Sequence, residues 1–312
     1  MSAASTRLDW LVFLALGLMW GSSYLFIKIG VETITPLTLV ALRLAVGAAV
    51  LAAVVLIARE PLPRTPRIYG HLLVMSILNI VLPFSLITWA ELTVPSSLAA
   101  ILTAIVPLVV IVIAAVALRD EPITANRLIG LAIGFGGVIV LVGPGALAAG
   151  ADLPAQLALI GASASYALAA VYARRTVTRL RPMVAAAVQV SFALALSVGL
   201  ALVLERPFEL ELGPSGLVAV VWLGVLGSGF AYLAFFRLIR SWGATRTSAV
   251  AYILPVVGIV MGVLFAGEVV DVRILAGTGL VIGGIALVNA RPGAATVRLD
   301  PGIKPEPAPL DR

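Results

Sequence analysis

Each half of the chain carries the same pattern of proline, glutamate and glycine. The pattern runs Pro…Glu…Gly…Gly-Gly, and it occurs as Pro107, Glu121, Gly130 and Gly136-Gly137 and again as Pro255, Glu268, Gly277 and Gly283-Gly284. From the glutamate onward the two copies keep one constant offset, with one residue of slippage before it. Upstream, Pro36 and Arg43 match Pro182 and Gln189 with their spacing kept. The second half therefore repeats the first, and we expect the two halves to share one fold.

Long apolar segments make up most of both halves. The chain is 61% hydrophobic and only 12% charged, whereas an ordinary soluble domain is about 25% charged. A helix needs about 20 apolar residues to cross the hydrocarbon of a bilayer, and the short alternating segments of a membrane β-barrel do not occur here. We place ten helices at 9–28, 35–58, 68–90, 96–118, 125–142, 155–173, 182–204, 215–238, 244–266 and 272–290. The predicted fold is an all-α integral membrane protein.

The number of spans in each half decides how the halves are related. Five is odd, so the second set of five helices must enter the membrane in the opposite direction to the first. Inverted repeats of this kind build secondary transporters, with the solute site at the interface between the repeats. We expect a first repeat at 9–142, a linker at 143–154, a second repeat at 155–290 and a disordered cytoplasmic tail at 291–312, which is rich in proline and lacks an apolar run.

Basic residues set the orientation, because Lys and Arg concentrate in cytoplasmic loops. With the N-terminus inside, all but four of the Lys and Arg residues fall on the inner side; the exceptions are Lys28, Arg43, Arg206 and Arg273. Both termini are therefore expected in the cytoplasm of a multi-pass inner-membrane protein. This loop bias also accounts for the net charge of +6, so no nucleic-acid partner is inferred.

Arg43 is the one basic residue placed well inside a span. An intramembrane charge costs several kcal/mol unless it reaches the headgroups or faces a polar cavity. Arg43 could snorkel outward or bond helix ends, or it could receive an anionic group of a solute in a central chamber. Its repeat partner Gln189 is neutral, so such a chamber would be polar but asymmetric.

Other polar and aromatic side chains fall inside the helices and are candidates to line that chamber. Each alone could bond its own helix or sit at the membrane interface, but together they suit a small solute with apolar and polar parts. The candidates for solute binding are Trp20, Ser23, Tyr24, Arg43, Asn79, Trp89, Tyr166, Gln189, Tyr232 and Tyr252.

Prolines and glycines suggest where helices bend and pack. Pro107 and Pro255 fall at matching places in the fourth and ninth predicted helices, where a proline removes a hydrogen bond and kinks the helix, so we expect them to act in gating. Gly130 and Gly134, like Gly279 and Gly283, form small-xxx-small pairs. Such pairs pack helices within a bundle or form a homodimer seam.

The sequence lacks the residues that several classes of function require. No Asp, Glu or His occupies the centre of a span, His71 is the single histidine, and cysteine is absent. Catalytic clusters, metal sites, bound cofactors and a phosphate-cradling Gly-Lys-Ser loop are not visible. We therefore predict no catalytic, cofactor or metal residues and no enzyme activity.

Three stretches carry a resemblance to the EamA-type transporters of the drug/metabolite transporter superfamily over 9–290. They are Trp20-Gly21-Ser22-Ser23, the segment from Pro36 to Arg43-Leu44, and the doubled block PLVVIVIAAVALRDEPITANRLIGLAIGFGG and PVVGIVMGVLFAGEVVDVRILAGTGLVIGG. The first copy departs from the family in reading Arg119-Asp120-Glu121 where Leu-Gly-Glu is usual. The resemblance implies two inverted repeats of five helices, cytoplasmic termini and movement of small metabolites, often the export of amino acids.

The predicted function is a secondary transporter that exports small metabolites, such as amino acids or amphiphilic compounds, by alternating access. An importer or facilitator of the same solutes is the alternative within transport. An integral-membrane enzyme and a non-transporting scaffold are the alternatives outside it. The expected partners are a small-molecule solute and the lipid bilayer, with a homodimer as a further option.

Overall fold

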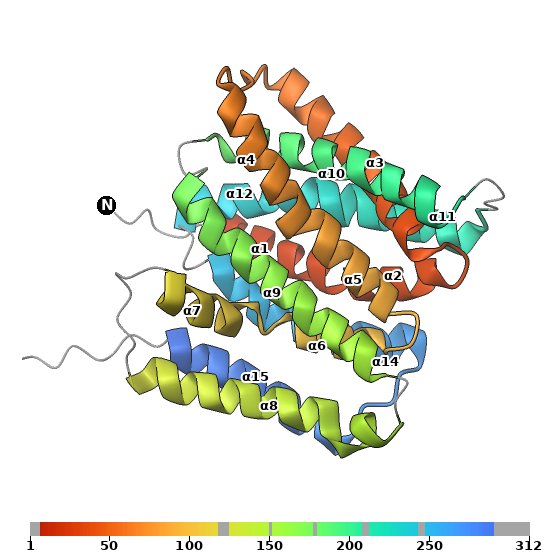
Figure 1. Ribbon diagram of the computed structural model, residues 1–312, viewed down its shortest axis with the longest axis vertical. Coiled ribbons are helices and arrows are strands. Elements are labelled where there is room, and N and C mark those ends of the chain that lie inside the picture. Colours follow the sequence, from red (N-terminus) through yellow and green to blue (C-terminus); the bar gives the residue numbers. More distant parts are fainter. Residues whose placement is uncertain are drawn as a thin grey trace, which may run out of the picture.

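The computed structural model describes residues 7–117, 125–149, 152–176, 180–207, 212–242 and 247–289, and these fold as a bundle of helices (Figure 1). Within them, nine helical segments are long and apolar enough to cross a membrane: Arg7–Val31, Pro36–Ile57, Pro66–Ala90, Ser96–Ala114, Ala125–Val142, Leu153–Thr176, Pro182–Leu204, Pro214–Leu238 and Ala249–Ala266. A shorter apolar helix covers Val272–Val288. The predicted class, an all-α integral membrane protein, is confirmed. The predicted inversion of the halves and the placement of the termini stay predictions, and the tail at 291–312 lies outside the described residues.

Several spans are assembled from more than one helix. The first consists of α1 (Arg7–Gly21) and α2 (Ser23–Val31). The third contains α4 (Pro66–Ser76), the π-helix η1 (Ile77–Val81) and α5 (Leu82–Ala90), and the eighth contains α11 (Pro214–Val221), the π-helix η2 (Trp222–Phe230) and α12 (Ala231–Trp242). Pro83 is the second residue of α5, and a proline ring clashes with the carbonyl four residues before it, which here belongs to η1. The wider π turn relieves that clash, and short π segments often occur at functional sites.

Pro107 and Pro255 lie in first helical turns, not in the middle of α-helices as predicted. The fourth span breaks between α6 (Ser96–Thr103) and α7 (Val106–Ala117), and Pro107 is the second residue of α7. In the ninth span, the 3₁₀-helix η3 (Ser248–Tyr252) leads into α14 (Ile253–Ala266), and Pro255 is its third residue. A proline is tolerated in a first turn because the N–H groups there have no partner within the helix. Each span therefore breaks just before its proline.

Several helix pairs join one half of the chain to the other, and two of them have the most extensive contacts. Along the first pair, α3 (Pro36–Ile57) packs on α10 (Pro182–Leu204). Glu205, just after α10, accepts hydrogen bonds at 2.8 Å from the amides of Leu37 and Thr38. Two of the free N–H groups at the start of α3 are thereby satisfied by a residue from the other half.

The second such pair is α8 (Ala125–Ala149) with α15 (Val272–Asn289), side by side along one edge of the bundle (Figure 1). A Cβ added at Gly284 would lie 2.6 Å from the carbonyl oxygen of Gly130, so the two backbones are in contact. No atoms lie within 4 Å of a Cβ built at Gly279 or Gly283. The pair Gly130 and Gly134 thus packs inside the bundle, whereas Gly279 and Gly283 face outward.

Helix α8 extends beyond the predicted end of this span at residue 142 and runs to Ala149. It therefore includes Pro144, which was predicted to lie in the linker at 143–154. Glycine and proline are tolerated in membrane helices when neighbouring groups satisfy the freed backbone. The next helix, α9, begins at Leu153 and ends at Thr176.

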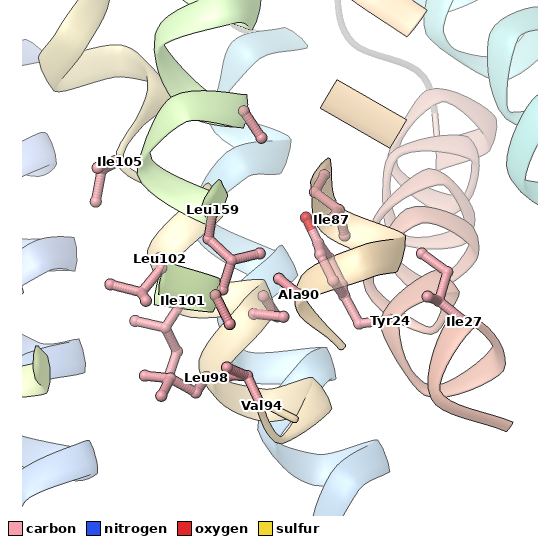
Figure 2. Packing of buried hydrophobic residues seen from close by; sticks show 14 of the residues in the cluster. Tyr24, Ile27, Ile87, Ala90, Val94, Leu98, Ile101, Leu102, Ile105 and Leu159 are labelled. Carbon is pink, nitrogen blue, oxygen red and sulfur yellow. The ribbon is translucent and has the colours of Figure 1, made fainter. Parts of the chain in front are cut away.

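Aliphatic side chains of several spans meet in the main core. Leu98, Ile101 and Leu102 on α6 pack near Leu159 on α9 and Ala90 at the end of α5 (Figure 2). Large parts of the bundle surface are also apolar: Ile57, Val203 and Leu264 are all exposed. An apolar core inside an apolar surface is what a helical bundle in lipid requires.

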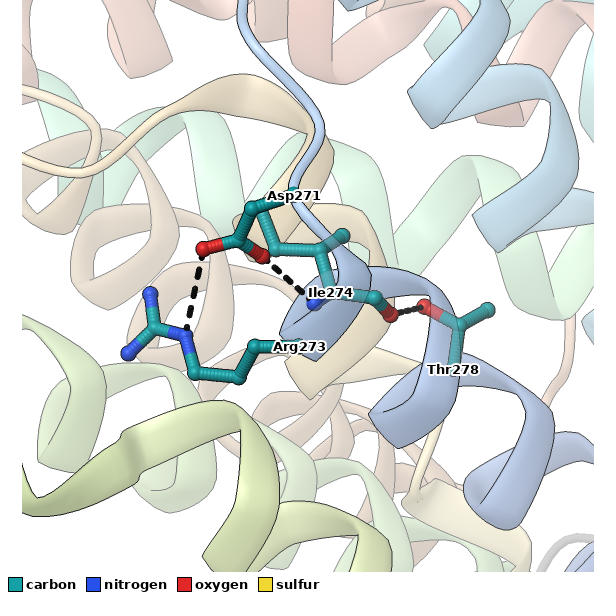
Figure 3. Close-up of polar contacts among 4 residues, drawn as sticks. All are labelled: Asp271, Arg273, Ile274 and Thr278. Atoms are coloured by element: carbon teal, nitrogen blue, oxygen red, sulfur yellow. Dashed lines mark hydrogen bonds and ion pairs between the residues drawn. The ribbon is translucent and has the colours of Figure 1, made fainter.

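The start of α15 has a side-chain cap. The carboxylate of Asp271 accepts the amide N–H of Ile274 at 2.8 Å, and Arg273 lies 3.7 Å from its other oxygen (Figure 3). One turn on, the hydroxyl of Thr278 donates to the carbonyl of Ile274 at 2.6 Å. This is the ordinary arrangement of an aspartate N-cap.

Candidate functional site

Arg43 lies in the first half of α3, and only 4% of its surface is exposed. Among the described residues, its guanidinium has no hydrogen-bond or ion-pair partner, and Nε is fully enclosed without an acceptor. It makes a cation–π contact with Phe84 on α5, whose ring centre lies 4.2 Å from the guanidinium carbon. A cation–π contact contributes about 0.5–2 kcal/mol, which offsets only part of the cost of burying a charge. The snorkelling alternative is therefore not what the structure shows.

Three tyrosines from three different spans lie within electrostatic range of this cation. Tyr24 on α2, Tyr166 on α9 and Tyr232 on α12 all lie close enough to interact electrostatically with Arg43. Tyr24 is anchored by a hydrogen bond of 2.5 Å between its hydroxyl and that of Thr103 on α6. Phenol rings offer both apolar area and a polar hydroxyl, and the role of these three tyrosines in solute binding stays a prediction.

The π-helix η2 closes one side of the same group. The indole N–H of Trp20 donates to the carbonyl of Gly227 at 3.2 Å, and the Trp20 ring meets that of Tyr232 edge-on at 6.4 Å. A Cβ at Gly227 would lie 3.0 Å from the Ser23 hydroxyl and 3.4 Å from Arg43 Nη2. Glycine at this place in the π turn therefore lets the guanidinium lie against the backbone of η2.

Ser23 is near the group, but its hydroxyl is already used. It donates to the carbonyl of Met19 at 2.8 Å, one helical turn back. Gln189 is buried at 8% exposure on α10, the helix that packs along α3. Asn79 lies half-buried within η1.

Two predicted binding residues lie elsewhere. Trp89 is 46% exposed on the bundle surface, where an amphipathic ring suits a lipid interface. Tyr252 donates its hydroxyl to the carbonyl of Ile285 at 3.1 Å and so ties η3 to α15. Neither position supports the predicted role in solute binding.

Phe84, Thr103 and Gly227 were not predicted, although all three touch the group around Arg43. Phe84 follows Pro83, and a proline in the middle of a predicted span is a signal for a helix break near a cavity. Thr103 lies shortly before Pro107, which is a proline of the same kind within a predicted span. The signal for Gly227 was a run of glycines at 224, 227 and 229, which is the composition expected of a weakened helix.

The arrangement is suited to recognise an anion that has an apolar part. A buried guanidinium offers forked N–H donors that match a carboxylate, and the rings beside it offer apolar area. A solute carboxylate would supply the acceptor that the described protein groups do not. The bundle is that of a multi-pass helical membrane protein, and it encloses a buried polar group around Arg43.

The chain belongs to the EamA-like transporter family, whose model matches residues 9–143 and 153–290. It is 32% identical over 279 residues to the uncharacterized inner membrane transporter YedA of Escherichia coli K12, covering 88% of each chain. The uncharacterized transporter YvbV of Bacillus subtilis is 26% identical over 276 residues, covering 88% of this chain and 89% of that one. A crystal structure with 23% identity superposes with a TM-score of 0.65 and covers 91% of this chain and 99% of its own, which supports the fold. The protein is a transporter of the multi-pass inner-membrane kind, and its relatives' names point to a non-enzyme.

Proposed function

We propose that the protein is a secondary transporter that exports small amphipathic metabolites with an anionic group, amino acids among them, by alternating access across the inner membrane. The observation that carries this proposal is the guanidinium of Arg43, buried at 4% exposure without a hydrogen-bond or ion-pair partner in the described residues. A charge that remains unpaired inside a bundle is costly. A bound anionic ligand would offset that cost by pairing with the charge.

In this proposal each group around the chamber has one task. Arg43 receives the solute carboxylate, while Phe84, Tyr166 and Tyr232 contact its apolar part. Trp20 closes the chamber beside η2. A charge-assisted hydrogen bond contributes about 1.5–3 kcal/mol, so the Arg43 contact would account for about a tenfold to hundredfold gain in affinity.

The breaks before Pro107 and Pro255 supply the movement in this proposal. One break follows α6 and the other precedes α14, two helices that pack together, and a break in the hydrogen-bond ladder is where a helix can bend. Bending of these two spans would open the chamber toward one side of the membrane at a time.

Flux through the purified full chain in liposomes tests the proposal. A panel of labelled amino acids and amphiphilic drugs is loaded inside or outside, and release or uptake is followed with an imposed solute gradient. Wild type should move at least one carboxylate-bearing compound, and Arg43→Gln should lower its apparent affinity about tenfold or more, with Arg43→Lys falling between. Arg64→Gln, in an exposed loop, is the matched control and should leave flux unchanged.

Two results would count against the proposal. Absence of flux for the whole panel would remove the transport role for these solute classes. Equal affinity in wild type and Arg43→Gln, at equal amounts of folded protein, would remove Arg43 from the site. Flux only with inward gradients, in oriented vesicles, would favour the importer over the exporter.

A further inference from the structure

A second buried ionisable group has no task in the proposed transport cycle. Glu91 immediately follows α5, at the end of the bundle that the charge pattern assigns to the outer face. Its exposure is 0%, and neither carboxylate oxygen has a hydrogen-bond partner among the described residues. A carboxylate buried without donors is strongly destabilised, whereas the neutral acid loses much less on burial.

Lys28 on α2 could have neutralised Glu91 but is held by the backbone. Its ammonium group donates to the main-chain carbonyl of Glu91 at 2.7 Å and to that of Val94 at 3.2 Å. The cation thus fastens the end of α2 to the turn after α5. The charge of Lys28 lowers the pKa of the Glu91 carboxyl, but among the described residues the two side chains form no ion pair.

A second carboxylate nearby, that of Glu268 after α14, has the partners that Glu91 lacks. It accepts the amide of Ser96 at 2.6 Å, the hydroxyl of Ser96 at 2.7 Å and the amide of Ser97 at 3.0 Å. Burial is the largest cause that raises the pKa of the Glu91 carboxyl, and the negative charge of Glu268 raises it further.

The titratable groups that act on Glu91 come from every side of it. They are Lys28 and Tyr24 on α2, Arg43 on α3 and Glu268 after α14. Burial is the main cause that raises the pKa of the Glu91 carboxyl well above its usual range. Glu91 is therefore in electrostatic contact with the cation of the proposed solute site.

Water can approach this end of the bundle. A cleft of about 350 Å³ is lined by Lys28, Glu32, Thr93, Pro95 and Glu268 among others. Lys28 links the cleft to the turn that holds Glu91. A small parting of α2 from that turn would bring solvent to the carboxyl.

We propose that Glu91 is a proton-binding site whose occupancy is coupled to the charge at Arg43. The carboxylate takes up one proton from water of the cleft, forming an O–H bond, and returns it to water when the turn next opens. The transport role of this coupling rests on the proposed function. An anion bound at Arg43 cancels the positive field at Glu91, so anion and proton binding reinforce each other. By linkage the effect is reciprocal, and efflux of accumulated solute would carry a proton with it.

Infrared difference spectroscopy on the full chain in lipid nanodiscs tests proton binding without any solute. The difference between wild type and Glu91→Gln at pH 7 should contain the carbonyl stretch of a protonated carboxylic acid. Glu32→Gln, an exposed carboxylate lining the same cleft, is the matched control and should not remove that band. Glu91→Leu replaces Glu91→Gln if the latter fails to fold. Absence of the band at neutral pH would overturn the proposal.

Removing the cation at Arg43 tests the coupling. In Arg43→Gln the pH midpoint of the Glu91 band should rise, with proton affinity increased about fivefold or more, the lower range of coupling between sites. Arg64→Gln should leave the midpoint in place. An unchanged midpoint in Arg43→Gln would overturn the coupling. Loss of the proposed transport function would instead appear as absent flux in liposomes, with these spectra unaffected.

Discussion

The guanidinium carbon of Arg43 lies 4.2 Å from the centre of the Phe84 ring, and among the described residues the guanidinium has no hydrogen-bond or ion-pair partner. Stability and function therefore make opposite demands on this position. We expect Arg43→Met to raise the unfolding free energy by about 1–3 kcal/mol, because replacing a poorly paired buried ion by an apolar side chain is often stabilising. Thermal unfolding in detergent measures the change. A lower melting temperature would indicate that Arg43 has a partner in the folded bundle.

Gly284→Ala should destabilise the contact between α8 and α15. Its Cβ would lie 2.5 Å from the amide nitrogen of Gly134 and 2.6 Å from the carbonyl oxygen of Gly130, and backbone atoms cannot move aside cheaply. We expect a loss of about 1–3 kcal/mol, typical of overpacking. The adjacent Gly283→Ala meets no atoms within 4 Å and should be neutral or stabilising by up to about 1 kcal/mol. Equal melting temperatures for the two variants would disprove the close contact.

Glu205→Ala should loosen the start of α3. The carboxylate accepts two amides of the first turn and the hydroxyl of Thr38, all at 2.8 Å. Its removal leaves those donors unpaired, at a cost of about 1–3 kcal/mol. Faster hydrogen exchange at the amides of Leu37 and Thr38 is the direct measurement. Glu32→Ala, at an exposed position, is the control, and similar exchange in both variants would rule out the cap.

Pro107→Ala and Pro255→Ala test the proposed bends. Alanine restores a backbone donor and favours a continuous helix, so both variants should lower flux without lowering the melting temperature. Pro66→Ala, at the exposed start of α4, provides a proline in a comparable turn outside the breaks and should transport normally. Wild-type flux in both test variants would remove the prolines from gating.

The stability of the protein should depend on pH through Glu91. Burial raises the pKa of this carboxyl in the folded state, so the folded state binds a proton more tightly than the unfolded state. The resulting stabilisation is complete below the ordinary carboxyl pKa and is lost as the pH rises through the folded-state value. The melting temperature of wild type should therefore fall from acidic to alkaline pH more steeply than that of Glu91→Gln. Parallel curves for the two proteins would contradict this.

The sequence predicted the helical spans well because their length is set by the bilayer and their composition by the lipid. It also singled out Arg43, since one basic residue within an apolar span stands apart from its neighbours. Phe84 and Trp89 show that the sequence did not predict which side chains face the interior of the bundle. Both are aromatic residues of the third span, yet Phe84 contacts Arg43 while Trp89 is exposed. In lipid, the buried and outward faces of a helix are equally apolar, so hydropathy does not tell them apart.

Local backbone geometry also could not be predicted from the hydropathy pattern of the sequence. The sequence placed Glu91 at a helix end, where a carboxylate is ordinarily solvated, and did not indicate that the turn folds inward. The π-helices η1 and η2 depend on how neighbouring spans satisfy the freed carbonyls. The hydroxyl of Ser165 on α9, for example, donates to the carbonyl of Leu78 in η1 at 2.6 Å. Such contacts arise only when the spans are assembled.

The backbone contact between Gly130 and Gly284 has a consequence for any motion of the bundle. It holds a helix of the first half against a helix of the second half, just as the carboxylate of Glu205 links α10 to α3. Bodies that tilt as units must therefore each contain helices of both halves. Two fragments produced by severing the chain near residue 150 would consequently remain associated in the membrane.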